Sequence, residues 1–142
     1  MVRVAAAQIA PDLDSADGTL ARVLETMRDA ARRGVELIVF PETFVPYYPY
    51  FSFVLPPVLQ GAPHLRLAER AVVVPGPVTQ AVAERARHHG MVVILGVNER
   101  DHGSLYNTQL CSMPTARSRS SAARSRPRTT SAWSGAWETA RG

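Results

Sequence analysis

The most constraining feature of the sequence is a short apolar run, residues 37–40, which is followed directly by a proline and a glutamate. Consecutive apolar side chains predict a strand that is buried on both faces of a sheet. Pro41 ends this strand, because proline has no N–H to donate to a sheet ladder. Glu42 follows directly, at the carboxyl edge where α/β proteins place their functional groups. A half-buried Glu42 would suit a general base, and an ordinary solvated loop glutamate is the simpler alternative.

The residues before this strand predict a β-α-β unit. Residues 2–9 form an earlier apolar strand, and residues 20–31 repeat apolar side chains at helical spacing. Ser15 can cap the start of that helix, and Gly34 is suited to the position just after its end. A strand, a helix and a second strand in this order imply parallel strands with a right-handed crossover.

One more helix and further strands are predicted downstream. Pro77 opens the helix, as proline does at a first helical position, and Gly90 ends it. Residues 91–97 form the third buried strand. Residues 105–110 form the fourth, after a turn at residues 102–104.

A segment rich in proline and aromatic side chains, residues 45–63, follows Glu42. We expect it to form a packed loop over the sheet edge, with a short helix near residues 53–59. Tyr48 and Phe51 are candidates to line a substrate-binding pocket around Glu42. Plain packing within the loop is the alternative interpretation for either aromatic ring.

Composition narrows the class of protein. A chain of 142 residues is one domain or part of one. A single cysteine argues against a disulfide framework, so we expect a cytoplasmic protein. No signal-peptide pattern and no apolar run long enough for a membrane are present. The four histidines lack metal-site spacing, so no metal is expected, and no phosphate-binding or dinucleotide motif occurs.

The sequence changes character near residue 111. Residues 1–110 hold 10 arginines and 11 acids, a net charge of −1, whereas residues 111–142 hold six arginines and one acid, a net charge of +5. Every basic residue is arginine, because the sequence contains no lysine. Residues 112–142 contain seven serines and no Val, Ile, Leu or Phe. This composition predicts a Ser/Arg-rich disordered tail over residues 111–142, with no strand and no specific nucleic-acid binding.

Five stretches of the sequence form a recognisable set: residues 4–9, 39–51, 73–78, 92–99 and 104–110. Together they resemble the carbon–nitrogen hydrolases, the nitrilase superfamily. The most specific stretch is residues 39–51, whose tyrosine- and proline-rich continuation is similar to the nitrilase branch. The resemblance covers residues 1–110. It implies an α/β fold, the N-terminal part of a nitrilase-type αββα sandwich, whose second sheet this chain does not supply. We therefore expect an exposed apolar sheet face and poor solubility.

The resemblance also implies a reaction, in which a nitrile and water give a carboxylic acid and ammonia without a cofactor. The family uses a Glu-Lys-Cys set, usually with a second glutamate, in a homo-oligomer. Glu42 corresponds to the first glutamate, the proton acceptor. The lysine has no counterpart, the second glutamate falls where Ser131 stands, and the nucleophile would lie beyond Gly142. Cys111 is a poor substitute, because a lone cysteine is usually a small buried hydrophobe. We therefore expect this chain to be inactive.

Two further interpretations accompany this one. The tail from residue 111 is compatible with a frameshifted reading of the gene, because permitted codons one nucleotide upstream can encode the family's next strand, turn and lysine segment. Alternatively, the chain is a non-catalytic fragment that pairs with an intact homologue or, through its arginines, with an acidic partner. Co-purification with a full-length homologue, or binding that collapses with added salt, would favour the second interpretation. An active enzyme that uses other residues conflicts with the missing lysine.

Overall fold

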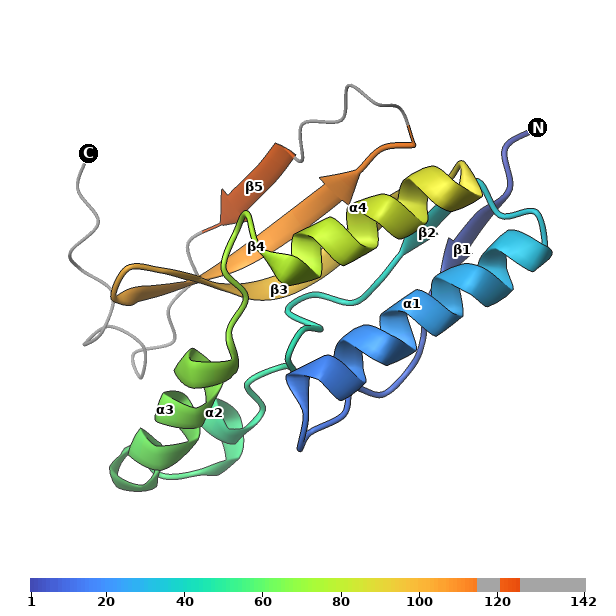
Figure 1. Cartoon of the computed structure of the whole chain (residues 1–142). Coiled ribbons are helices and arrows are strands. Elements are labelled where there is room, and N and C mark those ends of the chain that lie inside the picture. Colours follow the sequence, from blue (N-terminus) through green and yellow to red (C-terminus); the bar gives the residue numbers. More distant parts are fainter. Residues whose placement is uncertain (115–120, 126–142) are drawn as a thin grey trace.

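The computed structural model describes residues 1–114 and 121–125. In chain order its elements are β1 (Val4–Ala6), α1 (Ala16–Arg32), β2 (Leu37–Val39), α2 (Phe51–Val54), the short helix η1 (Pro57–Leu59), α3 (Gly61–Arg70), α4 (Pro77–His89), β3 (Val92–Asp101), β4 (Ser104–Ser112) and β5 (Ser121–Ser125). The strands form one sheet in the order β1-β2-β3-β4-β5 (Figure 1). Helices α1 and α4 lie side by side across the sheet, and α2 and α3 form a separate group near its end.

The predicted β-α-β unit is confirmed. β1 pairs with β2 and β2 pairs with β3, both in parallel, whereas β3, β4 and β5 form antiparallel pairs. The Ser15 side chain caps α1 by accepting a hydrogen bond from the Gly18 N–H at 3.0 Å. Gly34 follows α1 with a φ of 70°, a left-handed conformation that glycine adopts without a steric penalty.

The second predicted helix is also confirmed. α4 begins at Pro77, where the missing N–H of proline costs no hydrogen bond. It ends before Gly90, whose φ of 63° again lies in the left-handed region. The short helix expected near residues 53–59 is divided into α2 and η1. Leu55 between them is extended, as the residue before a proline prefers to be.

The two faces of the sheet differ in burial. Ile38, Val93, Leu95 and Val97 point toward the helices and pack in one core with α1 and α4 side chains such as Met27. The alternate residues lie on the other face, which we call the helix-free face. On it Val4 is 60% exposed, and the other apolar side chains are partly buried: Leu37, Val39, Val92 and Ile94.

This alternation corrects the expectation for residues 37–40. They were predicted to be buried on both faces, but burial is complete only for Ile38 and Phe40, which are 1% and 3% exposed. Leu37 and Val39 are only partly buried. Their side chains project from the helix-free face, which α1 and α4 do not cover. The expected apolar, partly exposed sheet face is therefore present in the described part of the chain.

The boundary of the predicted tail also needs correction. β4 extends through Cys111 and Ser112, and β5 pairs with it from Cys111↔Ser121 to Asn107↔Ser125. The prediction that no strand forms in residues 111–142 is therefore wrong at these positions. An edge strand such as β4 offers free backbone N–H and C=O groups, and pairing with them needs no apolar side chain. Ser131, Gly142 and the remaining tail positions lie outside the described residues.

Candidate functional site

The main chain that follows β2 runs alongside β3 before it leaves the sheet. The Phe40 N–H donates to the Ile94 carbonyl at 2.8 Å, and the Val45 N–H donates to the Gly96 carbonyl at 3.2 Å. The Asn98 N–H then donates to the Val45 carbonyl at 2.8 Å. Between these anchors, the backbone over residues 41–43 arches across β3. We call residues 41–47 the glutamate loop, because they carry Glu42.

Gly96 is the point on β3 that the glutamate loop crosses. A Cβ at Gly96 would lie 2.6 Å from the Thr43 nitrogen and 2.7 Å from the Glu42 Cα, and it would also meet the Pro41 carbonyl oxygen. All three are backbone atoms, so a clash could not be relieved by rotating a side chain. The register places residue 96 on the same face as Ile94. The loop, and with it Glu42, therefore lies on the helix-free face.

The side chain of Asn98, on β3, holds the glutamate loop in place. Its side-chain amide donates to the Thr43 carbonyl at 3.3 Å and to the Tyr47 carbonyl at 2.9 Å. The side chain is 4% exposed. Because a buried carbonyl without a donor is costly, these two hydrogen bonds favour the observed path of the loop over looser alternatives.

Glu42 itself is exposed, and it makes one contact with a neighbouring strand. Its Oε1 atom accepts a hydrogen bond from the side-chain amide of Asn107 on β4. Asn107 lies directly across from Asn98 in the β3-β4 register, so both side-chain amides donate hydrogen bonds to the same loop. The expectation that Glu42 is half-buried is wrong for this chain. The carboxylate stands on the face that α1 and α4 leave open.

Cys111 lies on the same face but away from this contact. It pairs with Ile94 and lies four positions along β4 from Asn107, which corresponds to about 13 Å of extended chain. The Cys111 side chain is partly buried, and its sulfur lies 4.0 Å from the Met113 sulfur. This position suits the interpretation of Cys111 as a small packing residue.

Tyr48 and Phe51 line a pocket of about 460 Å³, which we call the aromatic pocket. Aromatic side chains and two arginines from α3 contribute to its wall: Tyr47, Tyr48, Tyr50, Phe51, Arg66 and Arg70. Glu42 is not among the lining residues. The structure thus brings the two predicted aromatic residues together, but in a pocket that Glu42 does not line. A substrate pocket around Glu42 remains a prediction.

Part of the aromatic surface is already used for packing within the loop. The Tyr48 ring contacts the Tyr50 ring edge-on at 5.4 Å between centroids, and it stacks on Phe53 at 6.3 Å. The Phe51 ring meets the His64 ring at 4.7 Å, with the two planes perpendicular. Phe51 also packs against buried Leu67 and Leu105, which fixes α2 and α3 against the start of β4.

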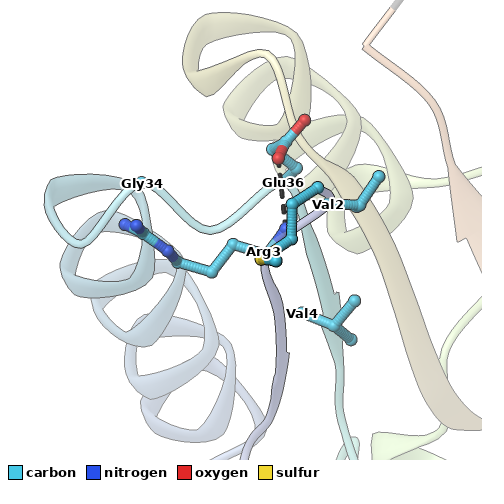
Figure 2. Close-up of a pocket in the computed structure, with 6 residues that line it drawn as sticks. Val2, Arg3, Val4, Gly34 and Glu36 are labelled. Atoms are coloured by element: carbon cyan, nitrogen blue, oxygen red, sulfur yellow. Dashed lines mark hydrogen bonds between the residues drawn. The ribbon is translucent and has the colours of Figure 1, made fainter.

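A second pocket, of about 440 Å³, lies at the opposite end of β2 from Glu42. Figure 2 shows the Arg3 backbone N–H donating to a Glu36 carboxylate oxygen, at 3.1 Å, while the Arg3 side chain extends toward Gly34. The Arg3 guanidinium donates to the Arg33 carbonyl at the end of α1. A cation there satisfies the negative end of the helix dipole. We assign this pocket a structural role.

The described residues contain no group of three or more His, Cys, Asp or Glu side chains that could hold a metal ion. Burial, followed by the nearby charges of His88 and Arg85, lowers the pKa of His89 and favours its neutral ring. In the same part of the chain, none of the helices combines the length and the apolar character that crossing a membrane requires.

The sequence is similar to proteins of one enzyme family. The family model for the carbon–nitrogen hydrolases matches residues 3–132. A nitrilase from Paraburkholderia phymatum is 72% identical over 110 residues, which cover 78% of this chain and 32% of the relative. An aliphatic nitrilase from Rhodococcus rhodochrous is 39% identical over 109 residues, which cover 76% of this chain and 30% of the relative. The chain thus spans about a third of the length of these curated relatives.

Solved structures show the same fold. A carbon–nitrogen hydrolase from Helicobacter pylori matches with a TM-score of 0.69 at 16% identity, over 96% of this chain and 43% of that one. A CN-hydrolase superfamily protein from Xanthomonas campestris matches with a TM-score of 0.61 at 17% identity, over 80% of this chain and 37% of that one. At such low identity, these matches show the fold alone.

The first prediction concerns the crossing at Gly96. We expect Gly96→Ala to lower the free energy of unfolding by about 1–3 kcal/mol, because the added methyl group overlaps backbone atoms of the glutamate loop. Chemical denaturation followed by circular dichroism measures this. Gly103→Ala is the matched control, since a Cβ at Gly103 would meet nothing within 4 Å. Equal unfolding free energies for the two variants would contradict the assigned role of Gly96.

Proposed function

Since this chain belongs to the carbon–nitrogen hydrolase family, we propose that it carries the base-bearing part of a nitrile hydrolase, with Glu42 as the proton acceptor. Its fold is the N-terminal α/β part of the nitrilase-type sandwich, as predicted. The observation that carries the proposal is the path of the glutamate loop. Gly96 and Asn98 fix this loop on the helix-free face, and Asn107 binds the Glu42 carboxylate there.

Glu42 has the geometry that a proton acceptor needs. One carboxylate oxygen, Oε1, accepts the Asn107 amide N–H, which orients the group and leaves Oε2 to accept a proton. Nitrile hydrolysis requires an activated nucleophile, a base that takes its proton and returns it to nitrogen, and a cation for the developing charge. Glu42 would perform the second of these tasks.

The substrate class rests on the relatives. Two similar proteins are named nitrilases, one of them an aliphatic nitrilase, so we propose a nitrile as the small-molecule substrate of the intact protein. Tyr48 and Phe51 are proposed to contact the organic group of that nitrile. We also propose a homo-oligomer in the cytoplasm, without membrane or specific nucleic-acid partners. The support is the single cysteine and the resemblance to the family.

The 142-residue chain taken alone lacks two of the three chemical functions. Its sequence contains no lysine. Its single cysteine pairs with Ile94, about 13 Å along β4 from the residue that binds Glu42. A general base alone contributes on the order of 10²–10⁴ in rate, and only where a nucleophile is present to be activated. We therefore propose that this chain by itself does not hydrolyse nitriles.

The second prediction tests this inactivity. The purified 142-residue chain, incubated with phenylacetonitrile or an aliphatic nitrile, should release no more ammonia than its Glu42→Ala variant. The reason is that the base has no thiol or cation partner. A colorimetric ammonia assay measures this, with an intact nitrilase as positive control. Ammonia release by the wild-type chain above the variant would show that other residues complete the site.

We propose further that residues from 111 onward are read out of frame. The support is the change of composition at this point, from a net charge of −1 to +5 and to a segment that lacks Val, Ile, Leu and Phe.

The third prediction concerns the gene, sequenced through the codon for Leu110 and beyond. Read in the frame one nucleotide upstream, it should encode a lysine-containing segment of the family. Codons that cannot be read in this way would end the proposal.

A second candidate function is pairing with an intact homologue. The observation that favours it is the helix-free face, where Val4 is 60% exposed beside the partly buried Leu37, Val39 and Ile94. Apolar sheet surface of this kind promotes association with other chains. An acidic partner for the tail arginines is the remaining alternative, and most of those arginines lie outside the described residues.

The fourth prediction tests pairing. In co-expression with an intact tagged nitrilase, the wild-type chain should co-purify, and Val39→Ser with Ile94→Ser should reduce its recovery several-fold by removing apolar contact area. Val58→Ser is the control, because Val58 is equally apolar and 86% exposed but lies on η1. Melting curves establish that the variants fold. Unchanged recovery of the folded double variant would argue against pairing through this face.

A further inference from the structure

We propose that the aromatic pocket binds a small aromatic carboxylate, whose charge is held by Arg66 and Arg70 and whose ring packs against tyrosine side chains. This inference assigns a binding site that Glu42 does not line, and it gives Tyr48 and Phe51 a role other than the nitrile contact proposed above. It requires neither a nucleophile nor a base.

The two arginines form the charged part of the pocket. Arg66 and Arg70 are four residues apart on α3, so their side chains emerge on the same face of the helix. In the described residues, arginine ion pairs involve Arg22, Arg28 and Arg32 on α1, and none involves the α3 pair. Two like charges one helical turn apart repel each other, and an anion between them relieves that repulsion. A guanidinium group also matches the two oxygens of a carboxylate.

Arg70 is already positioned by the protein. Its Nη1 atom donates to the Leu13 carbonyl at 2.9 Å, across a sequence separation of 57 residues. This hydrogen bond joins α3 to the segment between β1 and α1 and closes one side of the pocket. Arg66 is exposed at the rim, and its guanidinium can turn toward a ligand. The site thus combines one fixed cation with one adjustable cation.

The charge balance selects a monoanion. Asp14 also lines the pocket, so the lining side chains Arg66, Arg70 and Asp14 sum to a charge of +1. A carboxylate neutralises this charge, whereas a phosphate dianion would bring excess negative charge close to Asp14. A carboxylate is therefore the preferred anion.

The walls of the pocket select an aromatic body. Tyr47, Tyr48, Tyr50 and Phe51 line it, and the edge-on contact of Tyr48 with Tyr50 fixes the orientation of two of these rings. Aromatic side chains favour a ligand ring in offset-stacked or edge-to-face contact. A volume of about 460 Å³ is within the range of small-molecule sites and suits a single ring with a short acid group.

The fifth prediction follows. Phenylacetate, titrated into the full 142-residue chain and followed by ligand-observed NMR, should bind saturably. Arg66→Gln should weaken binding by about tenfold or more, because it removes a charge-assisted hydrogen bond. Arg87→Gln is the matched control, since Arg87 is an exposed arginine on α4, outside the pocket. Phenylacetamide, which has the same ring without the charge, should bind about tenfold more weakly than phenylacetate.

Further measurements separate this site from the proposed catalytic role. Glu42→Ala should bind phenylacetate as the wild-type chain does, whether or not any nitrile is hydrolysed. Melting curves establish that Arg66→Gln folds, and added salt should weaken phenylacetate binding more than phenylacetamide binding. Equal affinity of folded Arg66→Gln and wild type, equal affinity for acid and amide, or no saturable binding of phenylacetate would each overturn the proposal.

Discussion

The passage of one backbone segment over another is the constraint on which the proposed site depends. The glutamate loop crosses β3 where Gly96 leaves no room for even a methyl group. Asn98 lies two positions further along β3, and its side-chain amide donates to two loop carbonyls. Close packing of backbone on backbone leaves little freedom, so Glu42 emerges at one place on the helix-free face. Asn107 then orients the carboxylate from the adjoining strand.

The sheet has two unlike faces because α1 and α4 cover only one of them. Residues that point to α1 and α4, such as Ile38 and Leu95, are almost completely buried. Their neighbours Val39 and Ile94 are as apolar but remain partly exposed, beside the glutamate loop. A solvated antiparallel face would alternate apolar with polar residues, whereas these strands are apolar on both sides. The sequence of the sheet is therefore suited to a covering layer on the face that carries Glu42.

Local signals predicted the β-α-β unit, α4, β3 and β4, whereas the full length of α3, β5 and the long-range contacts escaped prediction. Ser15, Gly34, Pro77 and Gly90 mark helix ends through their own backbone chemistry, so a single sequence is sufficient to place them. Asn98 contacts residues 55 and 51 positions away, and Asn107 contacts one 65 positions away. Their side chains carry no local signal of such contacts, which depend on strand register. The pairing of β5 escaped prediction because it uses backbone groups that every non-proline residue has.

The proposed base and the arginines of the aromatic pocket lie at different places in the described residues. Lysine readily changes its protonation state when buried, whereas arginine stays charged and presents a planar fork. A chain whose basic residues are all arginines can thus hold an anion firmly, but it has no lysine to place beside the proposed base. In the described residues, Arg66 and Arg70 line the aromatic pocket, and Glu42 does not. The carboxylate that could accept a proton and the cations that could hold an acid therefore serve two different places on the molecule.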